Sequence, residues 1–239
     1  MILIVLAAGR GSRIRKFTSK PKCLIEIEKK KIIQYLIENI NVKFNKMIFV
    51  VGYRKKYLKK KINEIFKNKK IFFVENNLYK KTNNSYSIYL TRKLIDDDVI
   101  FVNADLYINS EVNSLQNKIN YKNFVFIDTN KKNLTNDDLT KVIYKKNKIL
   151  ELTKSSGTEK VNATSPGIYG FTKNRIHQHI EITKKKIKQK KLNEGFIEPI
   201  NELIKKGLKL NTIRLNRQTF WRNVNSIKDI KKIKNFIHR

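Results

Sequence analysis

The feature that most constrains the fold is an apolar run at the N-terminus and the small-residue loop that follows it. Residues 2–6 are all aliphatic, a pattern typical of a β-strand buried on both faces of a sheet. The next seven residues are Ala-Ala-Gly-Arg-Gly-Ser-Arg, and their small side chains let a ligand approach free backbone N–H groups. The loop ends in Arg13, and a second cation, Lys22, comes directly after Pro21. The pattern indicates either a polyphosphate site or an ordinary strand-to-helix turn.

Two common phosphate-binding motifs are absent from the chain. Residues 9–14 lack the third glycine of the dinucleotide-binding turn G-x-G-x-x-G. The sequence contains no Gly-Lys-Ser or Gly-Lys-Thr, so it has no P-loop. If the N-terminal loop binds phosphates, it does so by another arrangement.

Length and cysteine content favour a single domain in a reducing compartment. A chain of 239 residues is long enough for one α/β domain with a substantial core, and we predict one domain over 1–239. The one cysteine, Cys23, cannot form an internal disulfide. The N-terminal apolar run is too short for a signal peptide, and no stretch has the length of a membrane span. We therefore expect a cytoplasmic protein.

The formal net charge of +33 raises the question of a polyanionic partner. Such a surface would attract nucleic acid or anionic lipid. However, the lysines form short runs along the whole chain (29–31, 59–61 and 184–186), and Lys, Asn and Ile are abundant together, as in AT-rich coding sequences. No nucleic-acid-binding motif accompanies them, so we expect no specific nucleic-acid partner.

Alternating apolar patterns predict the architecture of the N-terminal half. Apolar runs at 47–51, 71–74 and 99–102 indicate further strands, and the apolar spacing at 31–41 and 58–66 indicates helices between them. This alternation predicts an α/β fold: a single Rossmann-like domain with a doubly wound, mixed but mainly parallel sheet and helices on both faces. In such folds ligands bind at the carboxyl ends of the strands. Asp105 follows the strand 99–102 closely and therefore lies at that edge.

The polar segment 75–86 leads into another predicted helix. Residues 82–85 are suitable N-caps, and we expect Tyr86, Leu90 and Leu94 to form the inner face of the helix. The segment could simply start a helix, or it could also line a ligand site.

The second half of the chain predicts shorter elements. Strands are expected at 124–127, 140–144 and 149–153, the last two joined by a Lys-Asn turn, and a mobile loop at 155–164. A strand over 166–171 and a helix that begins at Glu198-Pro199 and ends at Gly207 follow. Ser226 caps a terminal helix, with Asp229 three residues later. His177 and His179 belong to a polar helix and are expected on the surface.

The N-terminal segment resembles the signature L-A-A-G-x-G-[ST]-R…P-K of the nucleotidyltransferases that activate sugar phosphates and phosphocholine. Residues 83–90 resemble the N-N-x-Y-S-[IM]-Y-L segment of bacterial phosphocholine cytidylyltransferases, which lies across the nucleotide. Residues 103–105 resemble the motif [GND]-[DA]-D that carries the catalytic magnesium ion, and residues 166–171 the acceptor-side strand T-G-[IL]-Y-x-F. Near the end, residues 221–229 resemble W-x-[DN]-[IV]-[DN]-[ST]-x-x-D, in which the second acidic position ligates the metal. Here that position is Asn225, which can offer a carbonyl oxygen but adds no charge.

The resemblance implies a nucleotidyltransferase that needs Mg²⁺ and acts by aligning and neutralising phosphates. It implies catalytic roles for Arg13, Lys22 and Asp105, and magnesium ligands Asp105 and Asn225. It implies nucleotide contacts from Leu6, Ala7, Ala8, Gly9, Gly11, Ser12, Asn83, Asn84, Ser85 and Asn103. Tyr169, Phe196 and Glu198 are the expected acceptor-binding residues, of which Phe196 and Glu198 could equally be core and helix start.

The expected reaction is transfer of a nucleoside monophosphate, with CTP favoured, to a small phosphorylated acceptor such as phosphocholine or a phosphonate, releasing pyrophosphate. One alternative is a sugar-1-phosphate nucleotidyltransferase that makes an NDP-sugar. Another is a non-catalytic basic protein that binds nucleic acid or lipid on the same fold. The sequence leaves the base, the acceptor and the oligomeric state open.

Overall fold

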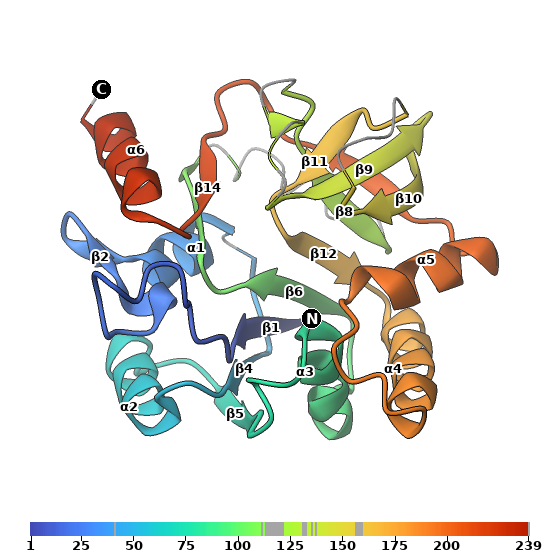
Figure 1. Ribbon diagram of the computed structural model, residues 1–239, viewed down its shortest axis with the longest axis horizontal. Helices are drawn as coiled ribbons and strands as arrows, with labels where there is room; N and C mark the ends of the chain where they lie inside the picture. The colour runs from blue at the N-terminus through green and yellow to red at the C-terminus, as the bar shows by residue number, and fades with distance from the viewer. Residues whose placement is uncertain are drawn as a thin grey trace.

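The computed structural model describes residues 1–40, 42–110, 112, 122–130, 133, 134, 136, 138–155 and 160–238 (Figure 1). Its strands are β1 (Ile2–Ala7), β2 (Glu26–Ile27), β3 (Lys30–Lys31), β4 (Lys46–Val51), β5 (Ile71–Glu75), β6 (Val99–Asn103), β7 (Leu106–Ile108), β8 (Phe124–Ile127), β9 (Thr140–Lys145), β10 (Lys148–Thr153), β11 (Ala163–Ser165), β12 (Ile168–Phe171), β13 (Asn211–Arg214) and β14 (Trp221–Asn223). Its helices are α1 (Ile32–Ile40), α2 (Lys55–Ile65), α3 (Asn84–Leu90), α4 (Lys173–Lys188), α5 (Ile197–Lys205) and α6 (Ile227–Ile237), with short 3-10 turns η1 (Lys22–Leu24) and η2 (Thr91–Leu94).

A ten-stranded mixed sheet forms the centre of the molecule, in the order β11-β9-β10-β13-β8-β12-β6-β1-β4-β5. The four strands β6, β1, β4 and β5 are parallel neighbours, as the apolar runs predict. Beyond β6 the sheet continues through β12, which is antiparallel to both β6 and β8. The predicted mixed α/β sheet is confirmed, and its parallel part places four strand ends at one edge.

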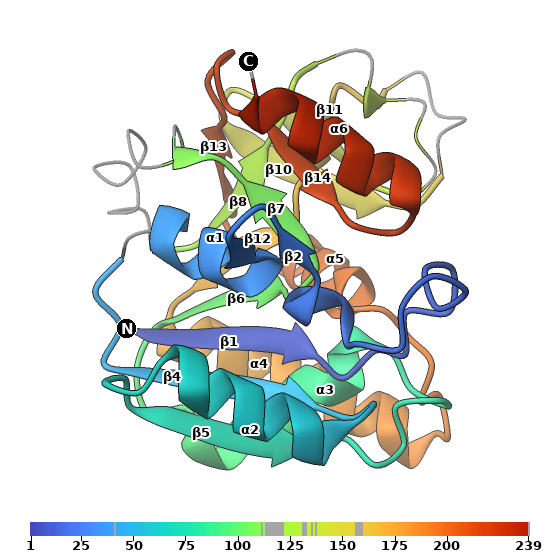
Figure 2. The ribbon, with the colours of Figure 1, turned by 90° about the vertical axis from the view of Figure 1, so that its left-hand side faces the viewer.

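Helices cover both faces of the parallel part because its strands are apolar on both sides. On β1, Leu3 and Val5 point into a core shared with α1 and α2, whereas Ile2 and Ile4 point into a core shared with α3, α4 and α5. All four side chains are fully buried. Figure 2 shows α1 and α2 on the near side of the sheet and α4 behind it. The predicted helices on both faces are confirmed.

A third, smaller core brings the two ends of the chain together. Ile14 from the N-terminal loop, Val224 after β14 and Ile233 of α6 pack in one buried cluster. Strand β14 pairs antiparallel with β7, which follows β6 directly. This pairing carries the segment before α6 to the carboxyl end of β6 (Figure 1).

Three local predictions are wrong. The buried residues of α3 are Ser85, Ser87 and Ile88 rather than Tyr86, Leu90 and Leu94, because the α-helix ends at Leu90 and the chain tightens into η2. His179 is fully buried in α4, not on the surface, whereas His177 is half-buried. Of the loop expected at 155–164, residues 163 and 164 belong to β11, and residues 156–159 lie outside the described residues.

The Lys146-Asn147 turn between β9 and β10 and the helix capped by Ser226 are as predicted. Lys146 and Asn147 both have positive φ angles, as a tight hairpin turn requires. Ser226 and Asp229 form a capping box at the start of α6. In the described part of the chain, no helix is both long and apolar enough to cross a membrane.

Candidate active site

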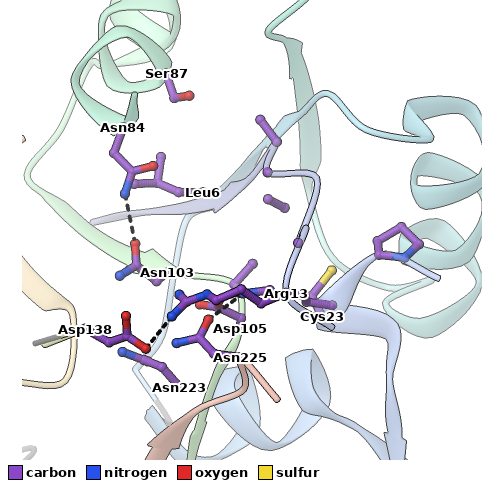
Figure 3. A pocket seen from close by; sticks show the side chains of 17 residues that line it. Leu6, Arg13, Cys23, Asn84, Ser87, Asn103, Asp105, Asp138, Asn223 and Asn225 are labelled. Atoms are coloured by element: carbon purple, nitrogen blue, oxygen red, sulfur yellow. Dashed lines mark hydrogen bonds and ion pairs between the residues drawn. The ribbon is translucent and has the colours of Figure 1, made fainter. Parts of the chain in front are cut away.

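A cavity of about 270 Å³ lies where β1 and β6 end (Figure 3). Leu6 and Asn103 are paired in the last register of these parallel strands, and the N–H of Ala104 donates to the Leu6 carbonyl at 3.2 Å. The cavity is lined by Leu6, Ala7, Ala8, Gly9, Gly11, Arg13, Pro21, Lys22, Cys23, Asn84, Ser87, Asn103, Ala104, Asp105, Asp138, Asn223 and Asn225. Most of the predicted nucleotide-binding residues therefore meet at one edge of the sheet, although they come from distant parts of the chain.

Lys22, Asp105 and Asn225 form the polar centre of this cavity. The Lys22 ammonium donates to Asp105 Oδ2 at 3.0 Å and to Asn225 Oδ1 at 2.6 Å. The lysine and aspartate side chains are 16% and 25% exposed, so the pair is only partly screened by water. Two side-chain oxygens thus converge on one cation, at the position where the sequence predicts two metal ligands.

Backbone pairing brings Asn225 to Asp105. Asn223 of β14 lies opposite Leu106 of β7, and the N–H of Val224 donates to the Asp105 carbonyl at 2.9 Å. The capping carboxylate, Asp229 Oδ2, accepts from the Asn225 N–H at 3.1 Å. These two hydrogen bonds, from the N–H groups of Val224 and Asn225, therefore hold the backbone at Asn225 just before α6 begins.

The glycine loop is shaped by Gly11 and anchored by Ile14. Gly11 has a φ of +64°, and a Cβ added there would lie 2.9 Å from Lys22 Cγ. Glycine is needed both for this backbone conformation and for the close approach of the lysine. Ile14 is buried in the third core, while Arg13 points toward the cavity and forms an ion pair with Asp138 (Figure 3).

Helix α3 contributes Asn84 and Ser87, which lie one turn apart. Asn84 Nδ2 donates to Asn103 Oδ1 at 3.3 Å, which joins the helix start to the end of β6 (Figure 3). Ser85, a predicted nucleotide contact, instead points away from the cavity and bonds Thr183 Oγ1 of α4 at 2.8 Å. Ser12 is exposed and lies outside the cavity lining, and Asn83 lines a neighbouring cavity instead.

The neighbouring cavity, of about 240 Å³, contains two of the three predicted acceptor residues. Its lining comprises Asn83, Asn84, Asn103, Asp138, Thr140, Lys154, Ser165, Gly167, Asn193, Gly195, Phe196, Ile197, Glu198 and Asn223. It shares Asn84, Asn103, Asp138 and Asn223 with the first cavity, so the two adjoin. Lys154 and Glu198 give it one cation and one carboxylate that the first cavity lacks.

Tyr169, the third predicted acceptor residue, lies in the core instead. Its ring stacks on Phe101 at 5.0 Å between centroids and packs edge-on against Phe196 at 4.7 Å. Burial raises the pKa of Tyr169 to about 12. Tyr169 therefore packs against Phe196 and does not line the cavity. Its side chain points from β12 into the core shared with α3, α4 and α5.

The fully buried His179 contacts the backbone of the segment between α4 and α5 at Phe196. Its Nε2 lies 3.2 Å from the Phe196 carbonyl oxygen, so the neutral ring donates a hydrogen bond there when Nε2 carries the proton. Burial lowers the pKa of His179 to about 4, partly opposed by that hydrogen bond. His179 is therefore a neutral structural donor near pH 7.

Two further features limit the chemistry of the site: the state of the Cys23 thiol and the number of groups that could hold a metal. Burial, with a further contribution from Asp105, raises the pKa of the Cys23 thiol to about 12, so this cysteine stays protonated. In the described residues no three His, Cys, Asp or Glu side chains cluster as a metal site of their own. A metal held by Asp105 and Asn225 would therefore need substrate oxygens, as Mg²⁺ sites on phosphates commonly do.

Sequence reasoning missed Asp138, Asn223, Ser87 and Lys154. Ser87 follows Asn84 by three positions and so shares its helix face, a signal the sequence did contain. Asn223 is the first polar position of the motif whose second position is Asn225. No pattern in the sequence indicates that Asp138 lines both cavities or that Lys154 lies beside it in the second one.

Comparison with known proteins places this chain in a family. Residues 2–239 match the nucleotidyl transferase family. The chain belongs to this family. The bifunctional protein GlmU of Methanocaldococcus jannaschii is 32% identical over 214 residues, 88% of this chain and 50% of that protein. The choline-phosphate cytidylyltransferase of Streptococcus pneumoniae is 36% identical over 113 residues, 45% of this chain and 46% of that protein.

Solved structures show the same fold. The inositol-1-phosphate CTP transferase from T. maritima superposes with a TM-score of 0.82 at 16% identity, covering 99% of this chain and 94% of that one. The chain spans about half the length of the curated relatives named above. The family and the fold are thereby established.

Proposed function

We propose that this protein transfers a nucleoside monophosphate, with CTP as the favoured donor, to a small phosphorylated acceptor and releases pyrophosphate. The observation that carries the proposal is the convergence of Asp105 and Asn225 on the Lys22 ammonium, beside a glycine loop at the strand ends. These groups neutralise and align phosphates, and phosphoryl chemistry needs little else from a protein.

Each group has a role that follows from its position. Gly9 and Gly11 expose the loop backbone to the phosphates, and Arg13 supplies a guanidinium for the leaving pyrophosphate. Lys22, held by the rigid Pro21 turn, stabilises charge on the transferred phosphate. The Asp105 and Asn225 oxygens already surround one cation in this structure and suit Mg²⁺, which they would hold. When bound, Mg²⁺ supplies charge neutralisation at the phosphates.

The preference for CTP rests on relatives rather than on a base contact. Two of the named proteins are described as a cytidylyltransferase and a CTP transferase. In this chain Asn84 and Ser87 line the part of the cavity formed by α3, and their uncharged polar side chains suit hydrogen bonds to a base.

The acceptor is expected in the adjoining cavity. Lys154 offers a cation to a phosphate or phosphonate group, and Glu198 offers a carboxylate to a cationic group such as choline. Phe196 contributes an apolar group to the same cavity. An acceptor that carries both a phosphate and a positive charge fits this pair of residues.

A sugar 1-phosphate is the second candidate. The cavity also contains Thr140, Asn193 and Asn223, whose side chains can bind hydroxyl groups. Among the described residues, no comparable site favours a purely binding, non-catalytic role for the basic surface.

Pyrophosphate release from each of the four nucleoside triphosphates, with Mg²⁺ and a panel of phosphorylated acceptors, tests the proposal. We expect CTP and phosphocholine-type acceptors to give the highest kcat/KM. Faster turnover of UTP with sugar 1-phosphates would establish the second candidate, and no turnover with any pair would refute catalysis.

Substitution of Glu198 tests the acceptor site separately. Glu198→Gln should raise KM for a cationic acceptor several-fold and leave KM for CTP nearly unchanged, because its carboxylate lines only the acceptor cavity. Glu194→Gln is the matched control, since Glu194 pairs with Lys186 at 2.5 Å and lines neither cavity. Equal effects of the two substitutions would contradict the acceptor assignment.

A further inference from the structure

We propose that Asp138 sets the affinity of the site for its nucleotide by competing with the phosphates for Arg13. The inference rests on the proposed function, in which Arg13 binds the phosphates of a nucleoside triphosphate. Asp138 belongs to none of the sequence motifs discussed above, and its position is evident only in the folded chain.

The ion pair joins two distant segments of the chain that both line the site. Arg13 Nη1 donates to Asp138 Oδ2, although the two residues are 125 positions apart. Arg13 lies in the glycine loop after β1, and Asp138 lies just before β9. Figure 3 shows the two side chains meeting. Asp138 lines both the nucleotide cavity and the acceptor cavity, so its carboxylate stands between the two.

The charges of the nucleotide cavity cancel, although the chain has a net charge of +33. Among the described residues that line it, the charged side chains are Arg13, Lys22, Asp105 and Asp138. Each cation is paired with one of the carboxylates. A triphosphate can use these cations only if it takes the place of their present partners.

The two ion pairs differ in what happens to the carboxylate when a nucleotide binds. Asp105 has a second role, because it would bind the metal that accompanies the nucleotide. Asp138 gains no metal in return: once Arg13 turns to the phosphates, its carboxylate loses this ion-pair partner, although the Lys154 ammonium, which donates to the Asp138 backbone carbonyl at 3.3 Å, stays close by. Asp138 is therefore expected to weaken nucleotide binding, and its removal to strengthen it.

The size of the effect follows from exposure. The Arg13 and Asp138 side chains are 56% and 43% exposed, so their pairing is screened and modest. Breaking such a pair changes an equilibrium by about two- to five-fold. The sign matters more than the size, because loss of a merely structural contact would weaken nucleotide binding or leave it unchanged.

Calorimetric titration without acceptor tests the inference. The wild-type protein is titrated with the Mg²⁺ complexes of all four nucleoside triphosphates, and the one bound most tightly is used for Asp138→Asn, Arg13→Gln and the double variant. Asp138→Asn should lower Kd about two- to five-fold at low ionic strength, with a smaller gain at high salt. In the Arg13→Gln background the same substitution should bring little gain.

Asp96→Asn is the matched control, because it removes an exposed carboxylate from another ion pair, with Lys46 at 2.8 Å, near the opposite ends of the strands. It should leave Kd unchanged. Asp138→Ala is a second variant and should reproduce the gain, and thermal unfolding checks that each variant is folded.

Unchanged or weaker binding by folded Asp138 variants would overturn the inference, as would an equal gain in the Arg13→Gln background. Failure of the proposed function gives a different result. In that case the wild-type protein binds none of the nucleotides, or Arg13→Gln binds as tightly as the wild type.

Discussion

Lowering the pH from 7 to 5 should destabilise the folded protein through one buried side chain, His179. Its pKa is lowered from 6.5 to about 4 by burial, although the hydrogen bond to Phe196 opposes the change. Between these two values the unfolded chain binds a proton that the folded protein does not. Stability is therefore fully present above pH 6.5 and is lost as the pH falls toward 4.

The magnitude follows from the two pKa values. At about 1.4 kcal/mol per pH unit, the interval from 6.5 to about 4 corresponds to about 3 kcal/mol. About 2 kcal/mol of this is lost between pH 7 and pH 5. The carboxylates with lowered pKa values, such as Glu75 with its pKa of about 2, lose their stabilising contribution only at lower pH, so this window isolates the histidine.

Urea denaturation at pH 7, 6 and 5 measures the effect. His179→Gln keeps an N–H donor but cannot titrate, so its free energy of unfolding should vary with pH by about 2 kcal/mol less than that of the wild type. His177→Gln, two residues away on the same helix and half-buried, should retain the wild-type pH dependence. Parallel pH profiles for wild type and His179→Gln would refute the reasoning.

Three further predictions concern the site and the surface. Gly11→Ala should lower kcat/KM about tenfold and the free energy of unfolding by about 1 kcal/mol, because it strains a φ of +64° and places a Cβ 2.9 Å from Lys22 Cγ. Gly207→Ala is the control, because Gly207 also has a positive φ, of +89°, but lines neither cavity: it should lose stability and keep kcat/KM, and equal losses of kcat/KM would contradict the argument. Asn225→Asp should retain activity and reduce the Mg²⁺ concentration needed for half-maximal rate, because it adds a charge beside Asp105; loss of activity at every Mg²⁺ concentration would give Asn225 another role. Any binding of DNA or RNA should be independent of sequence and should weaken steeply with salt in filter-binding assays, and a sequence-selective complex at physiological salt would contradict this.

The sequence predicts the parallel half of the fold well because each of its strands is apolar on both faces. The runs at β1, β4, β5 and β6 cannot be satisfied at the surface, and the helices between them follow from spacing alone. Short strands such as β7 and β14 escaped prediction because their pairing depends on partners more than 100 positions away. Propensity carries little information about such contacts.

The errors in helices α3 and α4 have separate causes. In α3, Ser85 and Ser87 face the core together with Ile88, in place of Tyr86 and Leu90, since α4 packs closely enough for Ser85 to bond Thr183. In α4, the buried residues Ile176, His179, Ile180 and Thr183 follow helical spacing, so position indicated burial where residue type suggested the surface. The prediction for His179 gave too much weight to its polarity.

The site itself was predictable where a motif fixed it and unpredictable where the fold created it. Gly11, Lys22 and Asp105 meet as expected, because two parallel strands end side by side. Asp138 could not be predicted, since its pairing with Arg13 arises from the path of the chain before β9.

The most direct test of the central claim is pyrophosphate release by the wild-type protein and by Asp105→Ala, with Mg²⁺, CTP and a phosphorylated acceptor. The wild type should release pyrophosphate only when the acceptor is present, and Asp105→Ala should be at least about 10²-fold to 10³-fold slower while unfolding at a similar temperature. Asp96→Ala, which removes an exposed carboxylate remote from the cavity, should match the wild type. Wild-type rates from Asp105→Ala would contradict the account of this site.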